Sequence, residues 1–325
     1  MAKGFPLLQG GIPAKSAALM TDLLPFQPSA SAPCRVVLLG GNGLLGGAFR
    51  RAWAAEERFA LTEFTRAELN LTRPEQIQSA LDRTEFDVLI NAAAYTQVDD
   101  AEVQPDLAMA VNAQAAGILA EICTARGARM VHFSTDYVFD GRQAQPYVET
   151  DGVQPVSAYG LSKWEGEQRV AAVSPQHLIL RLAWLFGPAR DAFPEWVLQQ
   201  ACRHAEVRVV SDKTGSPTCS LDVPGWVEAL LTVPEASGVI HLVNGPECTW
   251  QEYAQGVLDA AAGLGWPLRA TWATPVPLSS LPGLTAQRPV QSALNTEKFT
   301  RLTGLQPRPW PAAMADHLAL KAIPG

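Results

Sequence analysis

Hydrophobic and amphipathic segments alternate along the chain from residue 35 to residue 182. Five short apolar runs, which we expect to be buried strands, lie at 35–39, 58–65, 86–91, 129–134 and 177–182. Four longer stretches, which we expect to be helices, lie at 44–57, 74–83, 108–126 and 156–172. Strands that alternate with helices of this length predict an α/β fold with a Rossmann-like, doubly wound parallel sheet and right-handed crossovers.

The pattern changes after Gly187, where proline and tryptophan become frequent and the regular alternation stops. We expect this part of the chain to form a smaller, loop-rich lobe over residues 188–325. An apolar run at 239–244 looks like a strand that returns to the main sheet. The main domain is therefore predicted over 34–187, with a returning segment near 221–246.

The first 33 residues carry no regular pattern. Prolines and glycines interrupt every apolar stretch and charged residues are sparse, so the continuous apolar centre of a signal peptide is missing. We expect residues 1–33 to be a flexible extension or the product of an upstream start, and their sequence indicates no function.

Composition argues against several classes of protein. The 325 residues are 47% hydrophobic and carry a formal net charge of −7 without a basic run, which argues against nucleic acid as a partner. The five cysteines form no Cys-x-x-Cys pair and the five histidines have no metal-ligand spacing, so we expect neither disulfides nor a metal site. This cysteine usage fits a reducing, cytoplasmic location. Because no apolar run approaches the roughly 18 residues of a membrane span, we expect no membrane association.

Three glycines follow the first apolar run, at the start of the first expected helix. Gly40 permits a tight turn, Gly43 lets the backbone approach a pyrophosphate, and Gly46 lets the helix pack closely on the strand. The N–H groups at the start of the helix then bind phosphate oxygens. The spacing differs from the G-x-G-x-x-G of many dehydrogenases, and a glycine-rich turn without a ligand is the alternative. With a strand before it and a helix after it, dinucleotide binding is the interpretation that we favour.

Tyr159 and Lys163 lie one helical turn apart in the helix expected at 156–172, so both occupy one face. There a lysine ammonium can stabilise a phenolate and lower the pKa of the tyrosine, which is normally about 10. The pair alone is a weak signal and could be a half-exposed helix pair. Thr135 ends an apolar run 24 residues before the tyrosine. Together with the glycine loop, these three residues indicate a nicotinamide-dependent reductase.

Further segments strengthen this interpretation: 91–102 (NAAAYTQVDDAE), 134–141 (STDYVFDG), 212–218 (DKTGSPT), and Arg288-Pro289 followed by Ser292, Leu294 and Asn295. With the glycine loop and the Tyr-x-x-x-Lys pair, they resemble the extended short-chain dehydrogenase/reductase family, and within it the dTDP-4-dehydrorhamnose reductases. The resemblance runs from about residue 35 to the last helix. It implies an NAD(P)-binding Rossmann domain at 34–187 and a sugar-nucleotide-binding lobe at 188–325.

The resemblance also implies a reaction, namely reduction of the 4-keto group of dTDP-6-deoxy-L-lyxo-4-hexulose to dTDP-L-rhamnose. The implied cofactor is NADPH, with NADH as a second option, and the family allows a homodimer. Two alternatives stay open. One is a non-catalytic, NADP-binding regulatory subunit like that of methionine adenosyltransferase. The other is a different nucleotide-sugar epimerase, dehydratase or reductase of the family.

Roles for individual residues follow from the resemblance by position. Catalytic roles fall on Thr135, Tyr159, Lys163 and Asp136. Cofactor binding falls on Gly40, Gly43, Leu44, Leu45, Gly46, Arg66, Asn70, Leu71, Ala92, Ala93, Ala94 and Asn112, together with Tyr159 and Lys163. Substrate binding falls on Thr96, Val98, Tyr137, Trp184 and Arg288, the last as a contact to the diphosphate. A plain core aromatic is an equal alternative for Trp184.

In this scheme Tyr159 acts as the general acid and Thr135 hydrogen-bonds the carbonyl oxygen. Lys163 lowers the pKa of the tyrosine and binds the nicotinamide ribose. Three positions depart from the family pattern. Asn70 stands where aspartate is common, Lys213 stands where glutamine is common, and 182–183 read Leu-Ala where Thr-Ser is usual.

The end of the second expected strand bears on the choice between the two cofactors. NAD-selective dehydrogenases usually place an acidic residue there, and Glu63 comes one or two residues too early and is expected to point away. Arg66 follows closely and can bind a 2′-phosphate through charge-assisted hydrogen bonds, unless it is simply solvated. The sequence therefore predicts a preference for NADPH over NADH.

Overall fold

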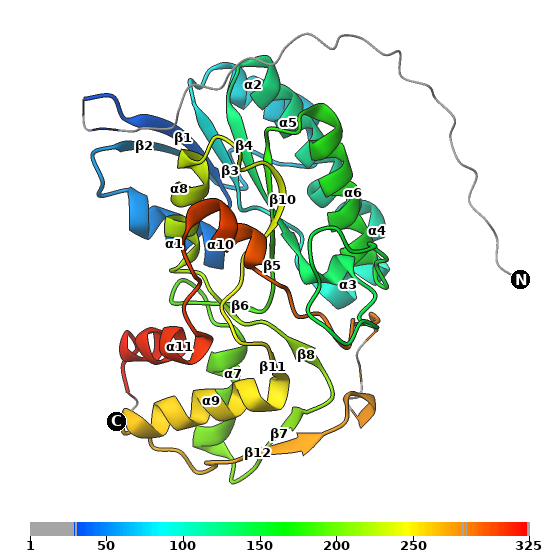
Figure 1. Cartoon of the computed structure of the whole chain (residues 1–325), viewed down its shortest axis with the longest axis vertical. Coiled ribbons are helices and arrows are strands. Elements are labelled where there is room, and N and C mark those ends of the chain that lie inside the picture. Colours follow the sequence, from blue (N-terminus) through cyan, green and yellow to red (C-terminus); the bar gives the residue numbers. More distant parts are fainter. Residues whose placement is uncertain (1–28, 30, 281–282, 284, 324–325) are drawn as a thin grey trace, which may run out of the picture.

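A six-stranded parallel sheet occupies the middle of the larger part of the molecule, with helices on both of its faces (Figure 1). The computed structural model describes residues 29, 31–280, 283 and 285–323. Most of the extension expected at 1–33 therefore lies outside the described residues.

The strand order of the sheet is β2-β1-β3-β4-β5-β10, and all neighbouring strands run parallel. The strands are β1 (Cys34–Leu39), β2 (Phe59–Phe64), β3 (Val88–Asn91), β4 (Arg129–Thr135), β5 (Leu178–Leu182) and β10 (Gly238–His241). The order of connection reverses between β1 and β3, and α/β folds bind ligands beyond the carboxyl ends of the strands at such a point. The doubly wound parallel sheet predicted from the sequence is confirmed.

Two layers of helices cover the sheet. One face carries α1 (Leu44–Trp53), α8 (Val223–Thr232) and α10 (Glu297–Thr303), and the other carries α2 (Pro74–Asp82), α5 (Ala115–Ala125) and α6 (Ala158–Val173). Successive side chains of a strand point to opposite faces. Val36 and Leu38 of β1 accordingly join the first layer's core, while Val37 and Leu39 join the second. Burial on both faces explains why the strand runs are continuously apolar.

The connection from β3 to β4 is helical over more of its length than the sequence predicts. It comprises α3 (Val98–Val103), α4 (Pro105–Met109), the π-helical turn η1 (Ala110–Gln114) and α5. Within the described part of the chain, its stretch Pro105–Ala125 alone is long and apolar enough to span a membrane, with a mean hydropathy of 1.4. Polar residues interrupt the stretch, so a search for an unbroken apolar run misses it. Its most apolar window is 56% buried, and α5 packs on α6, α2 and β4.

The smaller lobe has its own core between three helices and a two-stranded parallel sheet. Its elements are β6 (Leu185–Phe186), α7 (Phe193–Arg203), β7 (Val207–Val210), β8 (Thr214–Gly215), β9 (Thr218–Cys219), β11 (Cys248–Thr249), α9 (Trp250–Gly263), β12 (Ala273–Val276), η3 (Leu278–Ser280) and α11 (Trp310–Ala319). The strands β7 and β12 pair, and α7, α9 and α11 pack around Tyr253 and Val257. The elements α8 and β10, which lie in the returning segment expected near 221–246, pack with the main sheet, and so does α10 from farther along the chain.

A buried ion pair ties helix α6 to strand β5. The Arg181 Nε and Nη2 atoms lie 2.9 and 2.7 Å from the two carboxylate oxygens of Glu167, and each side chain is 1% exposed. The guanidinium also lies 5.0 Å from the centroid of the Phe139 ring. Two parallel hydrogen bonds to a charged partner fix the position of the helix along the sheet.

Replacing Glu167 by glutamine is expected to destabilise the fold, because the Arg181 charge stays buried without its counter-charge. Breaking one partner of such a pair typically costs about 3–5 kcal/mol. The free energy of unfolding is measured by urea denaturation followed by circular dichroism. Glu165→Gln, on the same helix and without an ion pair among the described residues, is the matched control. An equal loss in both variants would contradict a specific role for the pair.

Candidate active site

The glycine loop lies where β1 ends and α1 begins, and two of its glycines have no room for a side chain. The φ of Gly40 is +81°, and a Cβ there would lie 2.8 Å from the Ala92 carbonyl group. A Cβ on Gly46 would lie 2.1 Å from the Gly40 carbonyl oxygen. Gly43 precedes the helix as its N-cap without a side-chain cap, so the first N–H groups of α1 face the loop. The loop therefore has the shape of a phosphate cradle.

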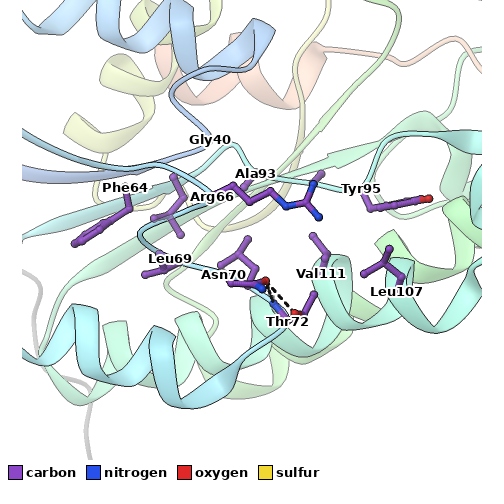
Figure 2. Close-up of a pocket in the computed structure, with 13 residues that line it drawn as sticks. Gly40, Phe64, Arg66, Leu69, Asn70, Thr72, Ala93, Tyr95, Leu107 and Val111 are labelled. Carbon is purple, nitrogen blue, oxygen red and sulfur yellow. Dashed lines mark hydrogen bonds between the residues drawn. The ribbon is translucent and has the colours of Figure 1, made fainter.

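A groove runs from this loop along the carboxyl ends of β1, β2 and β3 (Figure 2). Six residues with predicted cofactor roles line it: Gly40, Arg66, Asn70, Leu71, Ala93 and Ala94. Seven others that the sequence analysis did not select also line it: Leu39, Phe64, Leu69, Thr72, Tyr95, Leu107 and Val111. Most of these are apolar, as a flat purine base requires, but from sequence they look like ordinary core residues.

The remaining predicted cofactor residues lie around the groove. Gly43 lines the adjoining hollow beside the glycine loop. Leu45 and Gly46 are buried where α1 packs on the sheet, and Leu44 is partly exposed at the start of that helix. Ala92 packs against the core beneath Gly40.

Asn70 shapes the wall of the groove through the segment that follows it. Its Oδ1 atom accepts hydrogen bonds from the backbone N–H of Thr72 at 3.0 Å and from the Thr72 hydroxyl at 2.9 Å. An aspartate would make the same turn with an acceptor-only side chain. The departure from the family pattern therefore keeps the turn and removes one negative charge from the groove.

Glu63 points toward the glycine loop and the hollow beside it, which corrects the expectation from sequence that it points away. Its carboxylate accepts from Arg50 Nε at 3.0 Å, and a Cβ on Gly41 would lie 2.1 Å from its Oε2 atom. Arg50 Nη2 also donates to Asn42 Oδ1 at 3.1 Å. The arginine of α1 holds Glu63 against the glycine loop, and a strand register alone does not reveal such a partner. Glu63, Arg50 and Arg66 line one hollow.

The three predicted catalytic residues meet at the carboxyl end of β4. Thr135 ends that strand, and helix α6, capped by the Ser157 side chain, brings Tyr159 and Lys163 beside it. Tyr159 is 9% exposed and Lys163 is 2% exposed. The Lys163 ammonium donates to the Phe133 carbonyl oxygen at 2.6 Å, which anchors it to β4.

The pKa values at this site differ from the expectation. Burial raises the pKa of Tyr159 to about 12, and the neighbouring Thr135 hydroxyl opposes the rise. Burial lowers the pKa of Lys163 to about 8. Burial outweighs the expected lowering of the tyrosine pKa by the lysine, whose ammonium is bonded to the strand. A phenol with a raised pKa stays protonated at neutral pH, as a proton donor requires.

Asn112, in the π-helical turn η1, lies behind the site rather than on its surface. It is fully buried, its Oδ1 accepts from the Tyr95 N–H at 2.8 Å, and its Nδ2 donates to the Tyr95 carbonyl and the Ser162 hydroxyl. These bonds clamp the segment after β3 to helix α6. Asn112 therefore joins the groove to the catalytic helix without a free polar atom of its own.

The predicted substrate residues surround the catalytic residues on the lobe side. Tyr137 packs edge-on against Tyr159 with 5.6 Å between ring centroids, and Val98 packs in the same cluster, while Thr96 is exposed. Trp184 has a φ of +42°, a region that bulky side chains rarely adopt. Its indole N–H is buried without a hydrogen-bond partner among the described residues. A strained backbone with an unpaired donor favours a binding role for Trp184 over a plain core role.

Arg288 reaches this site from the lobe but is paired with a carboxylate that the sequence analysis did not select. Its Nη2 and Nη1 atoms lie 2.6 and 3.2 Å from the Asp99 carboxylate oxygens. Asp99, on α3, also accepts from the N–H groups of Thr285 and Ala286, both at 2.9 Å. These bonds hold the pKa of Asp99 at about 2. The feature of the sequence that could reveal this partner of Arg288 is the pair of aspartates at 99–100, within the segment 91–102.

Comparison with known proteins relates the chain to nucleotide-sugar reductases. The family model described as RmlD substrate binding domain matches residues 34–322. The dTDP-4-dehydrorhamnose reductase of Salmonella typhimurium is 34% identical over 275 residues, which cover 82% of this chain and 91% of that protein. A protein of Streptomyces antibioticus, named as a probable dTDP-4,6-dihydroxy-2-methyloxan-3-one 4-ketoreductase, is 35% identical over 288 residues, covering 87% and 94%.

Solved structures lead to the same group of enzymes. The dTDP-4-dehydrorhamnose reductase of Bacillus anthracis in complex with NADP matches with a TM-score of 0.82 at 30% identity, covering 89% of this chain and 100% of that one. A dTDP-glucose 4,6-dehydratase of Streptomyces venezuelae, 18% identical with a TM-score of 0.71, shares the fold alone. The family that the sequence motifs indicate is thus confirmed, and the chain belongs to the RmlD family, that of the dTDP-4-dehydrorhamnose reductases.

Proposed function

We propose that this protein reduces the 4-keto group of dTDP-6-deoxy-L-lyxo-4-hexulose to give dTDP-L-rhamnose, with NADPH as the reductant. The observation that carries the proposal is the meeting of Thr135, Tyr159 and Lys163 beside a nucleotide groove that begins at a glycine cradle. Full-length relatives named as dTDP-4-dehydrorhamnose reductases support the substrate, and the NADP complex of one of them supports the cofactor.

The residues present fit a dinucleotide. The cradle made by Gly40 and Gly46 has no space for a Cβ, and the open N-terminus of α1 suits a pyrophosphate. The apolar groove around Leu71 and Ala93 suits the adenine, and Arg66, which lines the same groove, can pair with a 2′-phosphate. When bound, the reduced nicotinamide supplies the hydride that the ketone carbon accepts.

The protein's own part in the reaction is to hold and donate a proton at the ketone oxygen. As hydride reaches C4, negative charge develops on that oxygen, and Tyr159 gives it the phenolic proton. Thr135 donates a hydrogen bond to the same oxygen. Lys163, held on β4, would bind the nicotinamide ribose and would provide positive charge that balances the phenolate left behind.

Substrate binding falls to residues that converge from both parts of the fold. We assign Trp184 and Tyr137 to the sugar, with Val98 as an apolar wall and Thr96 at the exposed entrance. Arg288 contacts the diphosphate and shares its guanidinium with Asp99. A homodimer and a cytoplasmic location stay predictions from the sequence.

The decisive test is incubation of the full chain with the dTDP-hexulose and NADPH, following the loss of nicotinamide absorbance. Turnover with formation of dTDP-L-rhamnose supports the proposal. NADPH binding without turnover, measured by fluorescence titration, would instead support the regulatory-subunit alternative.

Tyr159→Phe is expected to remove most of the turnover and to spare cofactor affinity, because the ring remains while the proton donor is lost. Positioned acid catalysis contributes on the order of 10²–10⁴-fold. The measurements are kcat and the Kd for NADPH. Tyr253→Phe is the control, since its hydroxyl is buried without a hydrogen-bond partner in the described chain. Near-normal kcat in Tyr159→Phe would remove this residue as the acid.

Arg66→Ala is expected to raise KM for NADPH about ten-fold and to leave KM for NADH nearly unchanged. Arg66 is exposed at the groove, and hydrogen bonds to charged groups contribute roughly 1.5–3 kcal/mol. Only NADPH has the 2′-phosphate that this side chain would contact. Arg208→Ala, an exposed arginine on β7, serves as the control. Equal effects on both cofactors would place Arg66 outside the phosphate site.

Glu63→Gln is expected to increase the preference for NADPH over NADH, measured as the ratio of their kcat/KM values. The Glu63 carboxylate lines the hollow, where it repels a 2′-phosphate and can accept a hydrogen bond from a 2′-hydroxyl. A glutamine does not repel the phosphate, and it is a weaker acceptor for the hydroxyl. The change also releases Arg50 toward the phosphate. A ratio that stays the same or falls would mean that the arginine already neutralises Glu63 completely.

A further inference from the structure

Lys213 is a fully buried lysine between the lobe and the sheet. It lies between β7 and β8, where the family commonly has glutamine, and its ammonium donates to the Pro289 carbonyl oxygen. The ammonium also lies 5.5, 5.7 and 6.0 Å from the ring centroids of Tyr137, Trp250 and Trp184. Aromatic faces within about 6 Å stabilise a cation. The surroundings are therefore built to keep a positive charge inside the protein.

Asp136 directly precedes Tyr137, whose ring centroid lies 5.5 Å from the Lys213 ammonium, and its charge interacts with this ammonium. It is 2% exposed, its Oδ1 accepts from the Thr135 hydroxyl at 3.0 Å, and its Oδ2 has no hydrogen-bond partner among the described residues. Burial raises the pKa of Asp136, and the Lys213 charge opposes the rise. Burial lowers the pKa of Lys213 to about 8, and Asp136 opposes that fall. Each group thus favours the charged form of the other.

Thr135 has a single hydroxyl hydrogen and two acceptors that require it. In the structure the hydrogen goes to Asp136 Oδ1. In the proposed reaction the C4 oxygen of the sugar requires the same hydrogen. A neutral Asp136 removes the conflict, because its own O–H can donate to Thr135 Oγ1 and leave the threonine hydrogen free for the substrate.

We propose that Lys213 is a positioning residue that controls the direction of the Thr135 hydroxyl by setting the charge of Asp136. The inference rests on the proposed reduction, in which Thr135 donates to the ketone oxygen. A positive charge nearby favours the ionised carboxylate, whereas a glutamine at this position has no charge to do so. With Lys213 present, the Thr135 hydrogen is therefore free for the substrate only over a lower pH range. With an uncharged side chain at this position, it would stay free up to a higher pH.

Other groups near Lys213 and Asp136 do not reverse the effect of the lysine charge on the Asp136 carboxylate. Those that face it from neighbouring elements are Arg288, Tyr137, Tyr159 and the uncharged hydroxyl of Ser292. Arg288 is compensated by its ion pair with Asp99. Burial raises the pKa of both phenols, so they stay neutral over the range in which Asp136 titrates.

The first test needs neither substrate nor cofactor. The full chain is labelled with carboxyl carbon-13 aspartate, and the Asp136 signal is assigned by its loss in Asp136→Asn and followed by NMR against pH. Lys213→Gln should raise the Asp136 midpoint by at least about one pH unit, because a nearby positive charge is removed. Lys298→Gln, which removes a half-buried lysine bonded to the Val239 carbonyl, should leave the midpoint unchanged.

An unmoved or lowered Asp136 midpoint in Lys213→Gln overturns the proposal. If Lys213→Gln melts early, Lys213→Met removes the same charge with a side chain that suits the apolar surroundings, and the same rise is expected. A rise caused by general loosening of the core would also appear in Lys298→Gln and would count against the proposal.

The second test is the pH dependence of kcat/KM. The descending limb that reports Asp136 should move to higher pH in Lys213→Gln. Between the Asp136 midpoint of the unchanged protein and that of Lys213→Gln, the variant should have the higher kcat/KM. The difference should reach about ten-fold if the two midpoints lie one pH unit apart. Asp136→Asn should lack this limb, and adding Lys213→Gln to it should move nothing further. A limb that stays in place in Lys213→Gln refutes the control of Thr135. A raised NMR midpoint without turnover in any variant counts against the proposed reaction, while the charge coupling stands.

Discussion

The close approach of helix α6 to the backbone beside it is the constraint on which the site depends. A Cβ on Gly160 would lie 2.2 Å from the Tyr137 carbonyl oxygen, and one on Gly166 would lie 2.2 Å from the Asn112 carbonyl oxygen. The two glycines therefore let the helix pack closely enough for the Lys163 ammonium to reach the backbone of β4. Larger side chains would lift the helix and separate the tyrosine and the lysine from Thr135 together.

This depth has an electrostatic consequence for Tyr159 and Lys163, because both are largely removed from water. Desolvation disfavours the charged form of each group, which keeps Tyr159 as a phenol and makes Lys163 easier to deprotonate. A reductase needs its acid protonated before the hydride arrives. Burial thus reinforces the protonated state that a tyrosine already has at neutral pH, and a charged Lys163 would oppose the cost of forming the phenolate.

The sequence predicts the fold, which the structure confirms, and the residues that we propose for catalysis, because both depend on short-range patterns. Strand runs, the glycine spacing and the Tyr-x-x-x-Lys turn all act within a few residues of chain. Pairings across long separations were not predictable: Arg50 turns Glu63 toward the glycine loop, and Asp99 occupies Arg288 from 189 residues away. The apolar groove wall was missed for another reason, since a residue that contacts a base has the same composition as a core residue.

Charges from the lobe meet charges from the sheet domain at the junction between them. Arg288 pairs with Asp99, and Lys213 faces Asp136 without a direct ion pair among the described contacts. Opposite charges that belong to different parts of the fold attract most strongly when water is excluded between them. Moving the lobe away from the sheet domain would therefore weaken both attractions. The contacts that hold Arg288 and Lys213 in place thus also hold the two parts of the fold together.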